Sequence, residues 1–217
     1  MTYRSRYDKA LRRHAILQRA ALLLVGFIIV SAIDFLLLRL LFDPTHQIET
    51  HDWYRLLRIQ GFVGTWIAAA LAFALVDRSW KRAGSVLACP IAAGALAELF
   101  KMILGRARPA INSQLLEPGY HFRPLFDGFR DAHNLGLPSS HATVAFAGAF
   151  IVSMHIPRAF PVLLALAIGC GYSRVASGAH FPSDVYAGAV LAWITARAFR
   201  ALTLRTHGPT AVPSTKQ

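Results

Sequence analysis

The sequence is poor in charged residues. Only 16% of its 217 residues are Asp, Glu, Lys or Arg, whereas 55% are hydrophobic and the mean hydropathy is +0.42. A soluble domain of this size rarely has so few charges, so the composition indicates a membrane protein. Cysteine is also scarce. Cys89 and Cys170 both lie inside apolar runs, which excludes a disulfide-rich scaffold, and we expect both to be small buried hydrophobic residues.

Acidic residues are the scarcer charge, with 11 Asp and Glu against 23 Lys and Arg, for a formal net charge of +12. Such an excess is found in nucleic-acid-binding proteins. Here, however, the basic residues lie in short runs between apolar segments, as the positive-inside rule of membrane proteins requires. We therefore expect the partner to be the lipid bilayer and not a nucleic acid.

Six apolar stretches are long enough, or nearly so, to cross the roughly 30 Å hydrocarbon core, which takes about 20 helical residues. We expect these spans at residues 20–42, 59–76, 84–104, 140–156, 159–177 and 184–203. The first apolar run follows a basic head, but it is too long for a signal peptide and no small-residue cleavage site follows it. Ala and Gly are frequent in several spans and let membrane helices pack closely. The predicted fold is all-α: a polytopic six-transmembrane-helix bundle that forms one integral membrane domain over residues 1–217.

The distribution of Lys and Arg predicts the orientation. Fourteen lie in residues 1–19, in the 77–83 loop, at Arg158 and from Arg197 onward, whereas the other set of loops and span ends holds seven. Both termini should therefore be cytoplasmic: a basic segment at 1–19 and a disordered tail at 204–217. The segment from Tyr3 to Arg19 is either a topology signal alone or an amphipathic helix on anionic lipid.

Three polar motifs lie on the opposite, periplasmic or extracellular, face, each at the edge of an apolar run. They are Lys101-x6-Arg108-Pro109, Pro138-Ser139-Ser140-His141 and Ser173-Arg174-x5-His180-x3-Asp184. Together they supply three fixed cations, two imidazoles, a hydroxyl and a carboxylate. This is the set of groups needed to hold a phosphate, attack it and protonate its leaving group.

The first two motifs suit phosphate binding. Lys101 ends the third span, and Pro109 disfavours helix at Arg108, so the chain should turn there and bring both cations to one anion. Ser139 and Ser140 begin the fourth span, where unpaired backbone N–H groups and the positive end of the helix dipole favour an anion. An ordinary serine N-cap is compatible with this. His141, just inside the helix, is placed to donate a proton to a leaving oxygen.

The third motif suits nucleophilic attack. Arg174 ends the fifth span, and His180 precedes the sixth, whose first turn Pro182 suits. Asp184 follows His180 by four residues and shares its face if the turn is helical. A carboxylate there accepts the Nδ1 proton, so that Nε2 presents its lone pair. This is the arrangement of a base and its orienting group in hydrolase triads, with the imidazole now acting as the nucleophile.

In these three motifs and their order, over roughly residues 84–203, the sequence resembles the type 2 phosphatidic acid phosphatase family, in its membrane-embedded bacterial branch. The resemblance implies that His180 is the nucleophile, through a phosphohistidine intermediate, with Asp184 as its partner and His141 as the general acid. It also implies a phosphate site without metal or cofactor, made by Lys101, Arg108, Ser139, the Ser140 backbone and Arg174. The family usually has Gly where this chain has Ser140, and the added side chain affects how closely the phosphate approaches.

The family also contains soluble acid phosphatases and vanadate-dependent haloperoxidases, but six spans favour a lipid substrate. We expect metal-independent hydrolysis of a lipid phosphate monoester or diphosphate at the outer leaflet of the bacterial cytoplasmic membrane. The candidates are phosphatidylglycerol phosphate, phosphatidic acid, undecaprenyl diphosphate and lipid A. One alternative is a lipid phosphotransferase with the same intermediate. Another is a lipid-binding or transport protein without chemistry, which would favour charges near the bilayer midplane instead of at span ends.

Several other ionisable residues are candidates for supporting roles. Asp34, inside the first span, should pair with Arg39 or with a neighbouring helix, because an unpaired charge in a membrane is costly. Glu98, three residues before Lys101, should form a supporting ion pair with it. The 105–139 loop shows no tight ligand spacing, so we expect it to cover the substrate and not to bind a metal; its ionisable residues are Glu117, His121, Asp127, Asp131 and His133.

Overall fold

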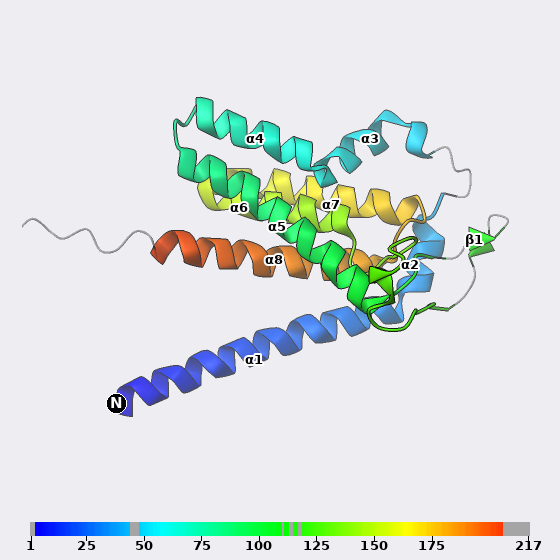
Figure 1. Ribbon diagram of the computed structural model, residues 1–217, viewed down its shortest axis with the longest axis horizontal. Coiled ribbons are helices and arrows are strands. Elements are labelled where there is room, and N and C mark those ends of the chain that lie inside the picture. The colour runs from blue at the N-terminus through cyan, green and yellow to red at the C-terminus, as the bar shows by residue number, and fades with distance from the viewer. Residues whose placement is uncertain (1–2, 44–47, 110, 113–114, 117–118, 206–217) are drawn as a thin grey trace, which may run out of the picture.

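The computed structural model describes residues 3–43, 48–109, 111–112, 115–116 and 119–205, and most of these are helical (Figure 1). The long helices are α1 (Tyr3–Ala32), α4 (Val63–Leu75), α5 (Trp80–Leu104), α6 (Ser140–His155), α7 (Phe160–Ala176) and α8 (Pro182–Arg205). The shorter helices are α2 (Asp34–Leu41), α3 (Asp52–Arg58), η1 (Ile48–Thr50), η2 (Ile59–Gly61), η3 (Asp127–Phe129) and η4 (Pro157–Ala159). Strands β1 (Ile111–Asn112) and β2 (Leu115–Leu116) form a minimal antiparallel pair in the loop after α5.

Helix α6 is the centre of the bundle and packs against α5, α7 and α8. All eight residues from Ala142 to Ala149 are buried. Five of them are Ala or Gly, which lets the neighbouring helices approach closely. A Cβ atom at Gly148 would lie 2.1 Å from the indole ring of Trp66 on α4, so a larger residue there would push α4 away. Cys89 and Cys170 are both fully buried and unpaired, as the sequence predicts.

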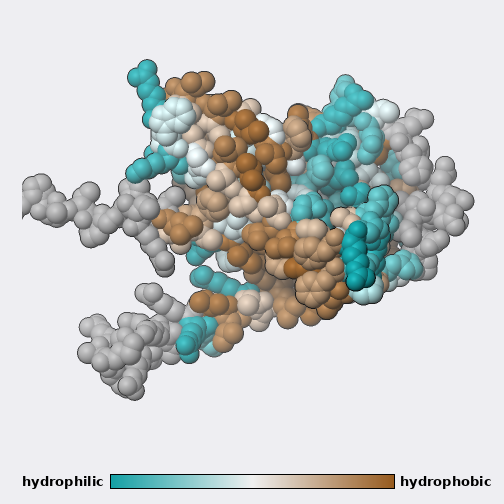
Figure 2. All heavy atoms as spheres, viewed as in Figure 1, coloured by the Kyte–Doolittle hydropathy of each residue, from teal (hydrophilic) through white to brown (hydrophobic). Residues whose placement is uncertain are grey.

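The membrane character of the fold is clear within the described part of the chain. Four helical segments are long and apolar enough to cross a bilayer: Arg13–Ala32, Trp80–Leu104, Pro157–Ala176 and Pro182–Leu202. The pair Asp52–Gly61 and Val63–Leu75, bent by 70°, adds a fifth if it forms one broken span. Figure 2 shows the corresponding apolar band across the helices, with hydrophilic residues at both ends. Helix α6 has only 16 residues, about 24 Å at 1.5 Å per residue, so the predicted total of six spans stays a prediction.

The first predicted span differs most from the structure. In place of one helix over 20–42, α1 ends at Ala32, and α2 begins at Asp34 after a turn at Ile33. The apolar window begins at Arg13, and α1 continues without a break through the basic segment from Tyr3. The turn at Ile33 brings Asp34 to the start of α8, where its Oδ1 accepts a hydrogen bond of 2.7 Å from the Ser183 N–H. The remaining predicted boundaries lie within four residues of the observed helices.

The two ends of the bundle differ in what they hold. Figure 1 shows the N-terminal end of α1 and the C-terminal end of α8 at one end, together with the turn between α4 and α5. At the other end are α2, the loop after α5, and the start of α8. All three sequence motifs lie at this second end, because each of them lies at the end of α5 or α7 or at the start of α6 or α8.

Candidate active site

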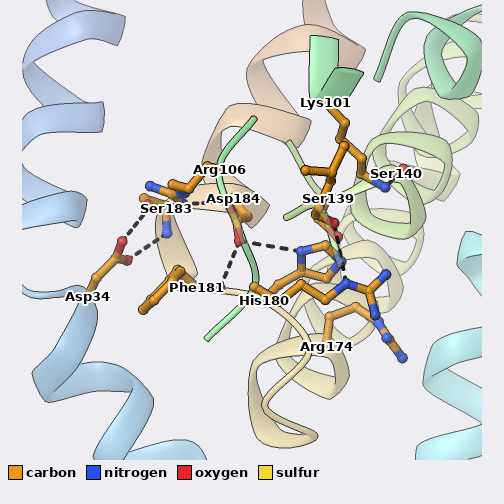
Figure 3. Close-up of polar contacts among 12 residues, drawn as sticks. Asp34, Lys101, Arg106, Ser139, Ser140, Arg174, His180, Phe181, Ser183 and Asp184 are labelled. Atoms are coloured by element: carbon orange, nitrogen blue, oxygen red, sulfur yellow. Dashed lines mark hydrogen bonds and ion pairs between the residues drawn. The ribbon is translucent and has the colours of Figure 1, made fainter. Parts of the chain in front are cut away.

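Histidine 180 lies at the centre of the motif residues, in the short connection between α7 and α8 (Figure 3). Its backbone N–H donates to the Arg174 carbonyl at 3.2 Å, which holds the connection tightly against the end of α7. The side chain is almost fully buried. Burial lowers the pKa of His180 to about 4, against the opposing effect of the Asp184 carboxylate. At neutral pH the imidazole is therefore uncharged and has a free lone pair on one nitrogen.

Asp184 orients this imidazole as the i, i+4 spacing predicts. Its Oδ2 lies 3.4 Å from His180 Nδ1, a long hydrogen bond, and accepts a second one of 2.9 Å from the Phe181 N–H. The carboxylate is fully buried in the first turn of α8. With Nδ1 directed at a carboxylate, the Nε2 atom is the one left to face a substrate.

A buried arginine that sequence reasoning missed neutralises Asp184. Arg106 Nη2 forms an ion pair with Asp184 Oδ1 and donates to Ser183 Oγ at 2.7 Å. Its guanidinium lies 5.0 Å from the ring centroid of Tyr120 and 5.2 Å from that of Phe181, and the residue is 2% exposed. Its position in the sequence could have indicated this role, because Arg106 lies between Lys101 and Arg108 of the first motif, just after the end of the third span.

Asp34 forms the outer layer of the same network. It accepts hydrogen bonds from the Ser183 N–H, the Ser183 hydroxyl and, at 2.9 Å, the Tyr120 hydroxyl. The alternative of a neighbouring helix is therefore confirmed, since Ser183 belongs to α8. Asp34, Ser183 and Arg106 connect α2, α8 and the loop after α5 to the carboxylate that holds His180 (Figure 3).

Lys101, Glu98 and Ser140 form a second polar group on the other side of His180. Lys101 Nζ donates to Glu98 Oε1 at 3.0 Å, so the predicted supporting ion pair is confirmed. Lys101 also donates to the Ser140 hydroxyl, which in turn donates to Glu98. The serine that replaces the usual glycine thus contacts the lysine of the first motif. Arg108 lies within electrostatic range of Lys101, Glu98 and Arg174, and its Nε donates to the Leu135 carbonyl at 3.3 Å.

The start of α6 lies between these cations and His180. Ser139 takes the N-cap position of α6, but its side chain makes no capping hydrogen bond. Its backbone N–H donates to the Asp184 carbonyl at 3.0 Å, which ties α6 to α8. His141, in the first turn, lies within electrostatic range of Arg174, His180 and Lys101. The open helix N-terminus therefore points to the same place as the cations.

Among the residues expected to hold the phosphate, two buried polar atoms have no hydrogen-bond partner in the described part of the chain: the Ser139 hydroxyl and Arg174 Nε. Arg106 Nε, beside Asp184, is also unpaired there. Leaving such atoms unpaired is costly. Arg174 is otherwise held by Nη1, which donates to the Tyr54 hydroxyl at 2.9 Å, and Tyr54 donates to Glu49 at 3.0 Å. An oxyanion bound beside His180 would satisfy both orphaned atoms. Tyr54 and Glu49 had no sequence signal that connected them to Arg174.

The loop after α5 contains the ionisable residues that the sequence analysis assigned to a substrate-covering loop and not to a metal site. Within the described residues, no group of three or more His, Cys, Asp or Glu side chains is close enough to hold a metal ion. Asp131 instead forms an ion pair with Arg123 at 3.0 Å. The hydrogen bond from the His133 N–H lowers the Asp131 pKa most, and Arg123 lowers it further. Glu117 lies outside the described residues. The substrate-covering role of this loop stays a prediction.

The fold and the site together define a helical protein with several apolar helices long enough to cross a membrane and a buried His–Asp pair near the N-terminus of α6. The model of the PAP2 superfamily matches residues 82–207, more than half of the chain and all three motifs. The chain belongs to the PAP2 superfamily, which confirms the family resemblance.

Relatives with assigned names are similar to this chain over part of their length. A lipid A 1-phosphatase of Rhizobium johnstonii is 34% identical over 151 residues, which cover 65% of this chain and 52% of the relative. An undecaprenyl-diphosphatase of Sulfolobus acidocaldarius is 27% identical over 146 residues, which cover 66% of this chain and 65% of the relative. The chain thus spans about half to two thirds of the length of these relatives. No solved structure matches the chain at a significant level.

Proposed function

We propose that the protein is a membrane phosphatase that hydrolyses a lipid phosphate monoester or diphosphate through a phosphohistidine intermediate. The observation that carries the proposal is the convergence of one neutral, carboxylate-oriented histidine, His180, with two orphaned polar atoms, on Ser139 and Arg174. The family and the names of the relatives point in the same direction.

In the first step, His180 Nε2 attacks phosphorus and forms a P–N bond while the P–O bond to the lipid breaks. His141, kept protonated by the anionic phosphate bound beside it, gives a proton to the departing lipid oxygen. Lys101, Arg108 and Arg174 offset the negative charge on the non-bridging oxygens. This stabilisation matters most in the five-coordinate transition state. Burial of His180 favours this step, because a protonated imidazole has no lone pair to attack with.

In the second step, water attacks the phosphohistidine and loses a proton to His141. The P–N bond breaks, its electron pair returns to His180, and inorganic phosphate leaves. His141 thereby regains the proton that it donated in the first step. The Asp184 carboxylate keeps the proton on His180 Nδ1 throughout, so that only Nε2 forms and breaks the bond to phosphorus.

The membrane arrangement proposed here has six crossings, with the site at the outer leaflet of the bacterial cytoplasmic membrane. Helix α6 would be the short sixth crossing, enclosed by α5, α7 and α8 instead of lipid. The excess of basic residues at the end opposite the site supports cytoplasmic termini. Cysteine labelling from outside intact cells tests this: Asp127→Cys, in the loop at the site end, should react, and Arg78→Cys, in the α4–α5 turn, should not. The reverse pattern would place the site in the cytoplasm.

The activity is tested with purified protein, a panel of lipid phosphates and EDTA, with release of inorganic phosphate as the measurement. We propose lipid A and undecaprenyl diphosphate as the first substrates to test, before phosphatidylglycerol phosphate and phosphatidic acid, because the relatives are named for them. We expect release with and without EDTA, and inhibition by vanadate, which adopts the geometry of the transition state. Transfer to an added alcohol in place of water would make the protein a phosphotransferase. No turnover of any phosphate ester would refute the proposal.

A further inference from the structure

A hydrophobic groove adjoins the phosphate-binding residues on the membrane-facing side of the bundle. It lies between α1, α5 and α8 and encloses about 460 Å³, within the roughly 300–1,000 Å³ that ligand pockets occupy. Of the side chains that line the groove, only that of Tyr186 carries a polar atom. The Tyr186 hydroxyl donates a hydrogen bond of 3.1 Å to the Leu23 carbonyl. The groove is therefore suited to an apolar ligand.

The shape of the groove follows from one close contact between α1 and α8. A Cβ atom at Gly26 would lie 2.3 Å from the Tyr186 hydroxyl, so a larger residue there would displace the Tyr186 ring. From this contact α1 diverges from the bundle toward its N-terminus (Figure 1). The groove lies beside this contact, with Leu23, Leu24 and Phe27 as its α1 wall, and none of the apolar window of α1 is buried in the bundle.

Two chain segments connect the groove directly to the phosphate-binding residues. On α5, Phe100 lines the groove, and its neighbour Lys101 contacts Ser140. Before α6, Pro138 lines the groove, and its neighbour Ser139 carries one of the two orphaned polar atoms. The same two pieces of backbone therefore form the wall of the groove and the edge of the phosphate site.

We propose that this groove holds a hydrocarbon chain of the lipid whose phosphate lies beside His180, an inference that rests on the proposed function. The lining of α8 runs from Tyr186 to Ile194, about 12 Å along the helix. Half of the roughly 30 Å hydrocarbon core is about 15 Å, so the groove has the depth of one leaflet.

The groove should fix the position of the lipid substrate more than it raises the affinity for it. A lipid chain leaves an equally apolar bilayer when it enters the groove, so little hydrophobic free energy is gained. What the groove provides is a fixed path from chain to head group, which aligns the phosphorus with His180 Nε2. Misplacement by about 1 Å can cost on the order of 100-fold in rate, so a blocked groove should slow the reaction of long-chain lipids most.

The test compares Ile194→Trp, which fills the deep end of the groove, with Ile168→Trp on the membrane-facing side of α7. The two isoleucines are matched in exposure, at 50% and 55%, and only Ile194 lines the groove. The measured quantity is the ratio of kcat/KM for a long-chain lipid phosphate to that for its short-chain analogue. We expect Ile194→Trp to lower this ratio about tenfold, which is less than the roughly 100-fold loss of rate that full misplacement would cause. Ile168→Trp should leave the ratio at the parent value. Equal ratios in the two variants would overturn the proposal.

A second measurement does not depend on turnover. In the His180→Ala protein, a lipid phosphate with a photoreactive diazirine near its chain end should label the α8 peptide that contains Ile194. Labelling of α4 or α7 in its place would overturn the groove assignment. If the parent protein releases no phosphate but the label still maps to α8, the proposed function fails while the groove remains a lipid-chain site.

Discussion

Loss of the Arg106 guanidinium should damage both folding and turnover. In Arg106→Met, the Asp184 carboxylate would keep its place in the first turn of α8 without its ion-pair partner, and the Ser183 hydroxyl would lose a donor. Both carboxylates of the network, Asp184 and Asp34, are fully buried. Removing one partner of a buried pair costs about 3–5 kcal/mol, because the other charge stays buried without compensation.

A loss of this size is a large part of the roughly 5–15 kcal/mol that stabilises a typical domain. The control is Arg39→Met, because Arg39 is an exposed arginine on α2, and such a surface change should stay within about 0.5 kcal/mol. Thermal or denaturant unfolding in detergent measures the difference. For turnover we expect about a 100-fold fall in kcat for the variant that folds, since Asp184 Oδ2 would no longer be anchored through Oδ1.

A double-mutant cycle identifies the cause. If the loss in Arg106→Met reflects unbalanced buried negative charge, Asp34→Asn should cost less in that background than in the parent, because it removes one of the two carboxylates. Arg106→Lys should restore part of the stability through its charge but not the paired contacts to Ser183 and Asp184. Strict additivity, or a loss no greater than that of Arg39→Met, would refute the charge-balance argument.

The remaining predictions concern the reacting groups. His180→Ala should abolish turnover and the acid-labile phosphoenzyme seen by rapid quench with ³²P-labelled substrate, and retained label would show that another residue is the nucleophile. Asp184→Asn should lower kcat by up to about 10⁴-fold, by analogy with the hydrolase triad, because the amide favours the wrong tautomer; activity within tenfold of the parent would contradict the orienting role. Ser140→Gly should free Lys101 for the substrate and lower KM, and an unchanged KM would show that the contact between them is broken on binding anyway. Because the His180 pKa is about 4 in the folded protein and about 6.5 when unfolded, the unfolded state binds more protons between these values. The free energy of unfolding should therefore fall as the pH drops from about 6.5 to 4, and fall less in His180→Ala; equal slopes would show that His180 is not held neutral.

The helices were predictable because each is a long apolar run that ends at a local signal. Ser79 precedes α5 and accepts a hydrogen bond from the Arg82 N–H, and Pro182 begins α8. The same locality made the motif residues predictable. The end of a helix carries unpaired backbone groups, so polar residues at several helix ends that lie on one side of a membrane are brought together by the topology alone.

The break between α1 and α2 was not predictable from local pattern, because its cause lies far along the chain. The residues around Ile33 are apolar apart from Ser31 and Asp34, and neither proline nor glycine marks a break there. The Asp34 carboxylate instead contacts Ser183, 149 positions away. Nothing near Asp34 in the sequence specifies that partner, and the same holds for Tyr54, 120 positions from Arg174.

These long-range contacts explain why the second layer of the site differs in kind from the first. The groups proposed to contact phosphate stand at helix ends and need only the topology to meet. His180, in contrast, must be held with one nitrogen toward a carboxylate while surrounded by apolar helices, and a lone buried carboxylate there would be strongly destabilising. Arg106 removes that difficulty for Asp184, and the donors Ser183 and Tyr120 remove it for Asp34. The turn at Ile33 and the extended chain after α5 are thus the structural cost of keeping one imidazole both buried and correctly oriented.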